Sequence, residues 1–492
     1  MPSDVPAIVK ELSRLIGAEH VLDAPPPRSA YNHDSSNRRG VEGRADAVAL
    51  PGTAQEVAAV VEWCYAHDVP VVPRGGGTGL VGGAVATQGG LVLSLERLRR
   101  VRELEPGLWR ILPEAGVSTR DVQRLARENG LFFGPDPGAA EQSQIGGNVA
   151  TNAGGPHALK YGVTGAWVAG VEVVLAPGEL VQVGGWAGKD VAGYDLKSLL
   201  VGSEGTLGVI TAVRLRLLPA PEAAIPLVVF VRTREQGCAA IEAVFAAGLR
   251  PSVLDFLDGE TLAILAASYP GAGTGAGDGA AATGARTGGQ GVPAEAGFAL
   301  ICEVDGSAAE ARAQREALVE LMREAPIHAL EVQEPADGRA LWRWRDGANP
   351  AVTSVRGGKV SEDVAFPLER LLEGLERFER IASAHGLRAC AWGHGGEGNV
   401  HATVLVDRSS EAELDAAEAV GEELFALVLE LGGSVAGEHG VGWLKRGRLE
   451  SQWDARAVEL HEQIKRAFDP KGLLNPGKKL ARYPARSRGT ST

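Results

Sequence analysis

Two histidines that flank a glycine-rich loop are the residues of this sequence best suited to chemistry. His394 and His401 lie on either side of the glycines in residues 395–398, and a hairpin there would present one imidazole at the end of each strand. Glu438, within a second glycine-framed stretch at 437–440, would add a carboxylate. A single histidine would be explained more simply as a polar loop residue. Two histidines and a glutamate together are typical ligands of a catalytic divalent metal that keeps open coordination positions.

The bulk composition is that of an ordinary globular protein. The 492 residues suffice for two domains or one elaborated domain, 45% of them are hydrophobic, and the net charge of −13 argues against a nucleic-acid-binding surface. No apolar run reaches about 18 residues, and the N-terminus lacks the apolar core of a signal peptide. The sequence therefore predicts a cytoplasmic protein, and it leaves open attachment to the inner face of the membrane.

The cysteines predict no redox cluster. They are far apart and form no CxxC pair: Cys64, Cys238, Cys302 and Cys390. We interpret them as reduced, buried, small hydrophobic residues. If electrons leave this protein, they leave through something other than an iron–sulfur cluster of its own.

The elements in the first part of the chain are short. Helices are expected after Thr53 and Ser118, each three residues before an acidic residue, which is the spacing of a capping box. Strands are expected at 69–73, 91–95, 170–183 (as a hairpin) and 207–217. The Pro-Ala-Pro sequence at 219–221 breaks this pattern and marks a domain boundary.

The second part of the chain has a different periodicity. Strands are expected at 227–231, 298–303, 328–332, 388–392 and 402–406, and helices at 234–247, 308–323 and 368–385. This alternation predicts an α+β domain with helices on one face of a largely antiparallel sheet. Residues 271–290 are a low-complexity run and predict a disordered surface insertion.

Three glycine-rich stretches predict a large phosphate-bearing cofactor. The first, at 74–83, contains a G-x-G-x-x-G pattern, but no apolar-periodic helix follows it, so a Rossmann site is rejected. Such a loop can still surround a diphosphate with backbone N–H groups. Each of these loops, taken alone, could equally well be a cluster of structural turns. The additional stretches at 134–155 and 202–211 favour one cofactor held mainly by backbone.

These loops, the histidine pair and the closing stretch at 468–478 (FDPKGLLNPGK) resemble the FAD-binding oxidoreductase family that includes vanillyl-alcohol oxidase. The similarity is greatest to the branch of D-lactate dehydrogenase, D-2-hydroxyglutarate dehydrogenase and the glycolate oxidase large subunit. It implies an α+β fold with a two-subdomain FAD-binding domain of the PCMH type at 1–220. An antiparallel-sheet α/β cap domain at 225–432 would follow. A helical C-terminal segment at 433–480 would return to the first domain, ahead of a tail at 483–492.

The resemblance also implies which residues bind FAD. The diphosphate would be held by Arg74, Gly75, Gly76, Gly77, Thr78, Gly79 and Leu80. The flavin and adenine portions would be lined by Pro135, Gly146, Gly147, Asn152, Glu204, Gly208 and Ile210, and the isoalloxazine would be touched by Asn475. Covalent members attach FAD through a histidine in the first loop. This chain has none there, so non-covalent FAD is expected.

The same resemblance assigns the metal and substrate residues. His394, His401 and Glu438 match the metal ligands, with zinc as the expected ion. His439 matches the substrate-activating histidine, and Arg345 matches an arginine that binds the substrate carboxylate. Lys359 lies near a family lysine, although its spacing to Pro367 differs by two residues. Residues that depart from the family pattern leave the substrate's identity open: Gln144, Glu397 and Thr403.

An α-hydroxyacid fits such a site. Its carboxylate and C2 oxygen would chelate the metal, which would acidify the hydroxyl. His439 would accept that proton, Arg345 would bind the carboxylate, and the C2 hydride would pass to flavin N5. The expected activity is oxidation of a D-2-hydroxyacid of the D-lactate, glycolate or D-2-hydroxyglutarate type to the 2-oxoacid.

Other functions are less favoured by the residues. A non-redox flavoenzyme of the alkylglycerone-phosphate synthase type would carry a run of histidines near 438–439 and lack the pair formed by His394 and His401. A non-haem iron oxygenase would leave the three loops without purpose, and a non-catalytic flavin-binding subunit would not need a complete metal set. The electron acceptor stays open among a quinone, an electron-transfer flavoprotein and a separate iron–sulfur subunit. A homodimer is allowed for.

Overall fold

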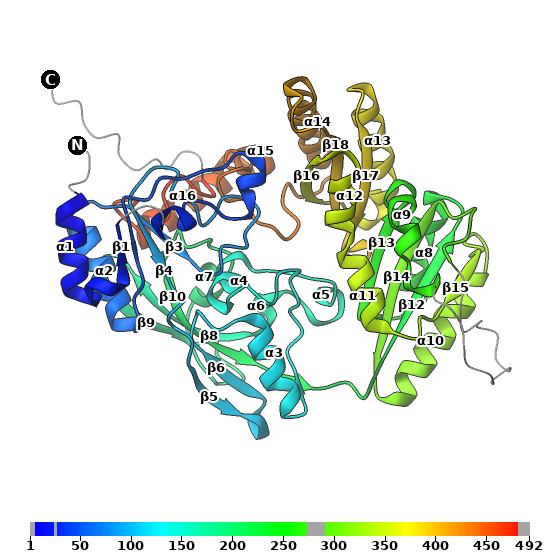
Figure 1. Ribbon diagram of the computed structural model, residues 1–492. Helices are drawn as coiled ribbons and strands as arrows, with labels where there is room; N and C mark the ends of the chain where they lie inside the picture. The colour runs from blue at the N-terminus through cyan, green and yellow to red at the C-terminus, as the bar shows by residue number, and fades with distance from the viewer. Residues whose placement is uncertain (1–4, 24–26, 273–290, 481–492) are drawn as a thin grey trace. The chain divides into compact units, whose positions relative to one another are not determined.

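The computed structural model describes residues 5–23, 27–272 and 291–480, which form two compact units (Figure 1). Unit 1 comprises Met1–Gly154, Gly162–Ala220 and Glu438–Thr492, and unit 2 comprises Gly155–Tyr161 and Pro221–Gly437. The sequence predicts a disordered insertion at 271–290 and a tail at 483–492. Residues 273–290 and the whole tail lie outside the described ranges.

Unit 1 is built from short helices and strands. These are α1 (Val5–Ile16), β1 (Val21–Leu22), β2 (Ala47–Ala49), α2 (Ala54–Ala66), β3 (Val71–Arg74), β4 (Leu91–Ser94), β5 (Val101–Glu105), β6 (Arg110–Pro113), α3 (Thr119–Glu128), β7 (Leu131–Phe132), α4 (Ile145–Thr151), α6 (Thr164–Trp167), β8 (Val168–Leu175), β9 (Glu179–Gly184), α7 (Leu196–Leu200), β10 (Val209–Arg216), β11 (Leu218–Pro219), α15 (Leu449–Gln452) and α16 (Ala455–Phe468).

Two sheets organise unit 1. The order β1-β2-β4-β3 makes a mixed four-stranded sheet, and β5-β6-β10-β8-β9 makes an antiparallel five-stranded sheet. Helix α2 begins after Thr53, whose Oγ1 accepts a hydrogen bond from Glu56 N at 3.1 Å, as the capping spacing predicts. Ser118 caps α3 in the same way. The buried faces of α1 and α2 share one apolar core with the four-stranded sheet.

The segment after α16 is held against β3. Val71 N donates to Leu473 O at 2.8 Å, and Asn475 N donates to Val71 O at 2.7 Å. Lys465 Nζ, itself buried, donates to Leu474 O at 2.9 Å and to Thr206 O at 2.7 Å. These bonds fix the stretch that carries Asn475 beside the first glycine loop of the same unit.

Unit 2 has longer elements. These are α5 (Ala158–Tyr161), β12 (Ala223–Val231), α8 (Arg234–Ala246), β13 (Val253–Asp258), α9 (Gly259–Leu265), β14 (Phe298–Gly306), α10 (Ala308–Arg323), β15 (Glu331–Gln333), α11 (Gly338–Asp346), α12 (Ala348–Arg356), β16 (Gly358–Ala365), α13 (Leu371–Ala384), β17 (Arg388–Gly393), β18 (Asn399–Val406) and α14 (Glu411–Glu430).

One seven-stranded sheet, ordered β15-β12-β14-β13-β17-β18-β16, forms the centre of unit 2, and all its pairings are antiparallel. The expectation that helices cover one face only is wrong. Side chains such as Val404 pack with α8, α10, α13 and α14, whereas side chains such as Leu405 pack with α9, α11 and α12. Successive side chains of a strand point to opposite faces, and apolar residues on both faces of the central strands require helices on both.

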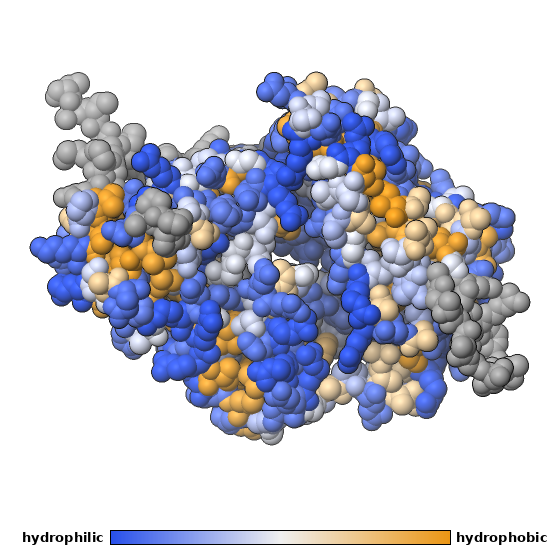
Figure 2. All heavy atoms as spheres, viewed as in Figure 1, coloured by the Kyte–Doolittle hydropathy of each residue, from blue (hydrophilic) through white to orange (hydrophobic). Residues whose placement is uncertain are grey.

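The surface is largely polar on the face shown in Figure 2, with hydrophobic residues exposed in several separate places. Within the described ranges, no helix combines the length and apolarity needed to cross a membrane.

Candidate active site

The loop between His394 and His401 is the turn of an antiparallel hairpin in unit 2, as the sequence predicts. Trp392 lies opposite His401, so His401 is inside β18, whereas His394 lies just beyond the end of β17. Gly398 has φ +67°, and a Cβ there would collide with the backbone of Phe366, so the turn requires glycine. The two imidazoles therefore come from a strand and a turn, not from two equivalent strand ends.

The two imidazoles lie close together. Their ring centroids are 5.8 Å apart with planes at 82°, and a ring nitrogen of His394 lies within 4.8 Å of one of His401. Both residues are buried. Zinc–nitrogen bonds are about 2.0–2.1 Å long, so a small adjustment of the rings would allow both nitrogens to bind one ion.

A buried ion pair holds His394. Its Nδ1 lies 2.8 Å from Asp255 Oδ1, and Asp255 Oδ2 accepts from Arg345 Nε at 2.7 Å. Burial would raise the pKa of Asp255, but the charges of Arg345 and His394 outweigh it and hold that pKa below its ordinary value. Arg345 thus lies beside His394, and its guanidinium is bound to a carboxylate of the protein itself.

A second buried carboxylate lies beside His401. Asp363 Oδ1 is 3.7 Å from His401 Nδ1 and accepts from Asn399 Nδ2 at 2.7 Å. Asp363 Oδ2 accepts from Gly437 N at 2.9 Å. A Cβ on Gly437 would occupy the place of the Asn399 amide, so glycine leaves room for that side chain and its bond to Asp363. Asp363 therefore links the hairpin to the last residue before Glu438.

Glu438 and His439 begin the last segment of unit 1. A Cβ on Gly154 would lie 2.8 Å from Glu438 Oε2, so the carboxylate packs against that glycine. His439 Nε2 lies 3.8 Å from Glu438 Oε1, so the two neighbouring side chains approach each other. Their side chains are 28% and 20% exposed, which leaves the histidine accessible to small molecules.

Lys359 lies on β16, on the same sheet face as Asp363, because residues two apart in a strand share a face. Its Nζ is 4.6 Å from the centroid of the Trp392 ring. Ser361 lies between them on β16, and its Oγ is hydrogen-bonded at 2.6 Å to Oγ1 of Thr403, which lies opposite it on β18. The face that carries the two carboxylate–histidine pairs thus also carries a lysine and two hydroxyls.

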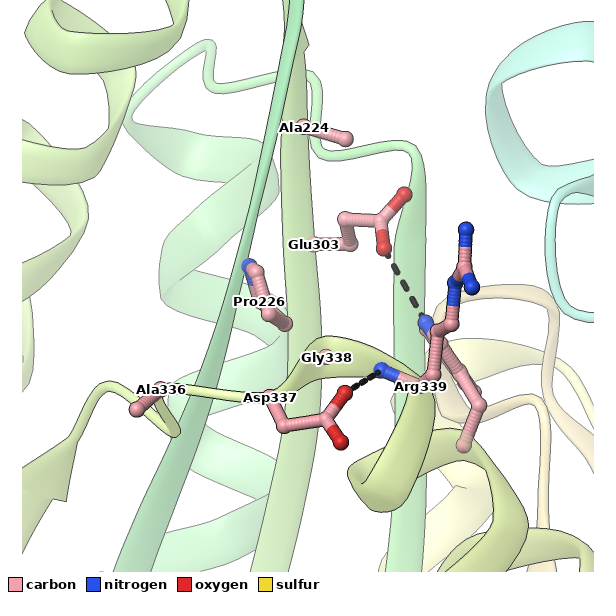
Figure 3. A pocket seen from close by; sticks show the side chains of 8 residues that line it. Ala224, Pro226, Glu303, Ala336, Asp337, Gly338 and Arg339 are labelled. Carbon is pink, nitrogen blue, oxygen red and sulfur yellow. Dashed lines mark hydrogen bonds between the residues drawn. The ribbon is translucent and has the colours of Figure 1, made fainter.

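A pocket of about 590 Å³ lies elsewhere in unit 2, beside Glu303 (Figure 3). Its lining consists of Ala224, Pro226, Glu303, Ala336, Asp337, Gly338, Arg339 and Trp342. Glu303 accepts from Trp342 Nε1 at 3.1 Å and lies 3.0 Å from His157 Nε2. Burial would raise the pKa of Glu303, but His157 outweighs it and lowers that pKa. The lining contains neither hairpin histidine, so we place the chemistry at the histidines.

The first glycine loop, between β3 and β4 in unit 1, folds around Arg74. Arg74 Nη1 donates to His33 O at 2.9 Å, and its guanidinium fills the space that a Cβ on Gly77 (φ +67°) would need. A Cβ on Gly76 would collide with the carbonyl of Gln142, so this loop packs against the second glycine stretch. The remaining predicted residues of the loop are Gly75, Thr78, Gly79 and Leu80.

The second glycine stretch has one packed and one open position. A Cβ on Gly146 would lie 2.6 Å from the Cβ of Ala115, whereas one on Gly147 would have nothing within 4 Å. Asn152 ends α4 with φ 53°, and Pro135 is buried in the loop before α4. Gly147 therefore leaves space beside the backbone, as close approach of a ligand requires.

The third glycine stretch is tied to the C-terminal segment. Asn475 Nδ2 donates to Gly83 O at 2.8 Å and to Glu204 O at 2.7 Å. The Glu204 carboxylate accepts from Val441 N at 3.0 Å and from Gly442 N at 2.6 Å. Glu204, predicted to line the cofactor, thus uses its carboxylate to hold the backbone just after His439.

Gly208 and Ile210 occupy packing positions. A Cβ on Gly208 would lie 2.7 Å from Val173 Cγ2, and Ile210 is buried in β10 opposite Val173. Gly208 therefore lets its backbone pack directly against Val173, and the Ile210 side chain packs within the sheet.

The residues present fit a flavin cofactor. Asn475 Oδ1 and Gln144 Oε1 are buried and have no hydrogen-bond partner among the described residues. Buried polar atoms are rarely left without partners, so each acceptor indicates a ligand donor such as a flavin N–H or a ribose hydroxyl. Both atoms belong to unit 1, which also contains the open glycine position.

Three residues of the site escaped the sequence analysis. Asp255, Asp363 and Asn399 surround the histidines; Asn399 lies within the stretch between them, whereas Asp255 and Asp363 belong to no recognisable motif. The one available signal was the alternation in β16, which puts Asp363 on the face of Lys359. Asp255 comes from a strand far away in sequence, so spacing gives no sign of it.

Two family descriptions match the chain. Residues 220–479 match the C-terminal domain of FAD linked oxidases, and residues 45–184 match an FAD binding domain. Together they cover the first two glycine stretches and the histidine hairpin, and the third stretch lies between the two matches.

Individual proteins are similar along nearly the whole chain. A protein named glycolate oxidase subunit GlcD, from Bacillus subtilis (strain 168), is 33% identical over 476 residues, which cover 96% of this chain and 97% of the relative. A protein named D-2-hydroxyglutarate dehydrogenase, from Xanthomonas citri pv. viticola, is 35% identical over 451 residues, which cover 89% and 90%. The solved structure of p-cresol methylhydroxylase with substrate bound has a TM-score of 0.78 at 17% identity and covers 97% of both chains, a likeness of fold alone.

Proposed function

Since the chain belongs to the FAD-linked oxidases, we propose that it oxidises a D-2-hydroxyacid to the 2-oxoacid with the help of a divalent metal. Its place among the FAD-dependent hydroxyacid dehydrogenases and oxidases follows from relatives that span nearly the whole chain. Beyond membership of this family, we propose a substrate of the D-lactate, glycolate or D-2-hydroxyglutarate type and a bound divalent metal. The observation that carries it is the buried imidazole pair of His394 and His401 beside Arg345.

The donor set suits zinc. Two imidazoles and one carboxylate, supplied by His394, His401 and Glu438, leave open positions on the ion. Glu438 follows directly after Gly437, whose N–H is bound to Asp363, and consecutive Cα atoms are about 3.8 Å apart. The residue directly before Glu438 is therefore bonded to the carboxylate beside His401.

When bound, the metal would acidify the C2 hydroxyl of the substrate and FAD would take up the hydride from C2. The protein's residues bind and orient the substrate and move the proton. His439 accepts the hydroxyl proton at a ring nitrogen, a role that imidazoles commonly take as general bases. Arg345, fixed by Asp255, supplies positive charge for the substrate carboxylate, and Lys359 supplies a second cation.

FAD is proposed to be non-covalent and held in unit 1. The loop at 74–80 would surround the diphosphate, and Asn475 and Gln144 would offer their buried oxygens to the flavin and ribose. Electrons would leave to a quinone, an electron-transfer flavoprotein or a separate iron–sulfur subunit. A homodimer is part of the proposal.

Anaerobic flavin bleaching tests the reaction. The purified holoprotein is mixed with glycolate, with both enantiomers of lactate and with both enantiomers of 2-hydroxyglutarate, and the oxidised-flavin absorbance is followed. We expect bleaching by glycolate or by one or more D-acids and no comparable bleaching by the L-acids. A flavin that stays oxidised with every acid of the panel would overturn the proposal.

The same experiment addresses a non-redox synthase of the alkylglycerone-phosphate type. Such an enzyme would leave the flavin oxidised with hydroxyacids and would exchange an acyl for an alkyl group without an external acceptor. Relatives that match nearly the whole chain are named as an oxidase subunit and a dehydrogenase, which favours the redox function.

A further inference from the structure

We propose that Asp255 and Asp363 are positioning residues that orient His394 and His401 for a divalent metal. The inference rests on the proposed metal-dependent function and deepens it. Both carboxylates are 1% exposed, lie on the sheet of unit 2 and each face Nδ1 of one imidazole. A histidine that binds a metal through one ring nitrogen commonly donates the other N–H to a carboxylate, which fixes its tautomer and ring orientation.

The geometry at His394 selects one tautomer. Its Nδ1 lies 2.8 Å from Asp255 Oδ1 and 3.5 Å from Arg345 Nη2. Nδ1 can donate to the carboxylate or accept from the guanidinium. The contact to Asp255 has the length of a charge-assisted hydrogen bond, whereas the other is at the limit of bonding. We therefore assign the proton to Nδ1, which leaves Nε2 free of a proton to bind a metal.

Arg345 balances the charge of this pair. Its Nε and Nη2 both lie 2.7 Å from Asp255 Oδ2, while Oδ1 faces His394. An isolated buried carboxylate would be costly, and the arginine offsets that cost by binding Oδ2, which leaves Oδ1 to accept from the imidazole. Asp255 sits at this place because β13 pairs with β17, with Phe256 opposite Gly393, the residue before His394.

Asp363 lies beside the second histidine, His401, and also binds the backbone N–H of Gly437. It lies opposite His401 in the pairing of β16 with β18, with Oδ1 at 3.7 Å from Nδ1. This is longer than a hydrogen bond, so the attraction is electrostatic. Asn399 Nδ2 and Gly437 N each donate to this carboxylate, one to each oxygen. One carboxylate thus faces His401 and fixes the residue before Glu438.

Zinc release measures this positioning role apart from turnover. The flavin-loaded protein is saturated with zinc and freed of excess metal. It is then mixed with a chromogenic chelator, and zinc content and release rate are recorded for the natural protein and for Asp255→Asn, Asp363→Asn and His401→Ala. Loss of such a carboxylate typically weakens metal affinity by about 10–100-fold. We expect Asp255→Asn and Asp363→Asn to bind one zinc at saturation and to release it faster by about that factor.

Asp258→Asn is the matched control. Asp258 is also buried on β13, but its carboxylate accepts from Thr261 N and Ala391 N, each at 2.8 Å. Its zinc release should equal that of the natural protein. A far-ultraviolet circular dichroism spectrum and a thermal unfolding midpoint close to those of the natural protein verify the folding of every variant.

A double variant separates orientation from charge. Asp255→Asn alone leaves Arg345 without its partner carboxylate, and that charge by itself would repel a cation. Asp255→Asn combined with Arg345→Gln restores neutrality without restoring the hydrogen bond to His394. We expect zinc release to stay fast in the double variant, and a return to the natural rate would overturn the orienting role.

The remaining outcomes are also decisive. An Asp255→Asn release rate equal to that of Asp258→Asn would refute positioning of His394. An Asp363→Asn protein that releases zinc at the natural rate, or that binds none at saturation, would refute the role of Asp363, and the second result would make it a ligand. A natural protein that binds no more zinc than His401→Ala would instead refute the metal in the proposed function, and with it this inference.

Discussion

At the residue scale, the two histidines differ in how their second nitrogen is held. His394 has a short contact to Asp255, whereas His401 is farther from Asp363. His439, in the other unit, lies near Glu438 and is partly exposed. A buried imidazole fixed by a carboxylate suits a metal ligand, and an accessible imidazole suits proton transfer.

Variants of the histidines should separate these roles. His401→Ala should lose metal and activity together and keep FAD, because the glycine loops belong to the other unit. His439→Ala should keep metal and FAD and slow flavin reduction by about two to four orders of magnitude, the usual effect of removing a positioned base. Metal analysis and stopped-flow reduction measure both, with His385→Ala, on the surface of unit 2, as the control. If His439→Ala lost the metal and His401→Ala kept it, the roles of ligand and base would be reversed.

Asp258 should make the stability of unit 2 depend on pH. Burial raises its pKa to about 6, above the ordinary value of about 3.9. The folded protein then binds this proton more tightly than the unfolded chain. The stabilisation that the protonated Asp258 gives to the folded state is therefore fully present below about pH 4. It falls as the pH rises to about 6 and is absent above that range. Between pH 4 and pH 7 the natural protein should lose up to about 3 kcal/mol relative to Asp258→Asn. Denaturant unfolding of both proteins tests this, and a pH-independent difference would contradict it.

At the scale of elements, sheet pairing places the carboxylates beside the histidines. β13 and β16 bring a carboxylate to each side of the β17–β18 hairpin, and Gly437 N, in the same unit, donates to Asp363. In unit 1, Glu204 holds the backbone after His439 from within the third glycine loop. A loop predicted to bind the cofactor therefore also fixes the segment that carries the base.

Glu204→Gln should loosen that segment without emptying the flavin site. The amide can accept only one of the two bonds from Val441 N and Gly442 N, and losing a bond to a buried N–H costs about 1–3 kcal/mol. We expect faster hydrogen exchange in peptides spanning 438–442, slower flavin reduction and unchanged FAD content. Exchange that stays at the natural rate in these peptides would show that Glu204 does not hold the segment. Glu114→Gln, at a buried carboxylate of the same unit that is bound by Arg100, is the control.

At the scale of the molecule, the predicted residues divide between two units. The glycine loops, Asn475, Glu438 and His439 belong to unit 1, and His394, His401, Arg345 and Lys359 belong to unit 2. The chain passes from one unit to the other after residues 154, 161, 220 and 437. Flavin binding and the histidine pair can therefore be perturbed separately.

Acid precipitation should release intact FAD into the supernatant. The loop at 74–80 contains no histidine or cysteine that could form a covalent link to the flavin. The protein pellet should be colourless, and the supernatant should contain FAD by chromatography and fluorescence. A pellet that keeps the flavin absorbance after washing in denaturant would establish a covalent attachment elsewhere in the chain.

The sequence by itself determined the features that depend on local residue patterns. Capping residues such as Thr53 and Ser118 set helix starts, and the apolar runs around residues 395–398 set the hairpin. Long ordered motifs identified the family. These succeed because caps, turns and strand alternation are decided by residues near one another in the chain.

Only the tertiary structure decided what surrounds the histidines. Asp255 reaches His394 because β13 pairs with β17 across more than a hundred residues of chain. The helix that carries Arg345 and the helices on the second face of the sheet also escaped prediction. Which strands become neighbours depends on the packing of the whole unit, so no local sequence spacing could predict that a carboxylate lies beside each imidazole.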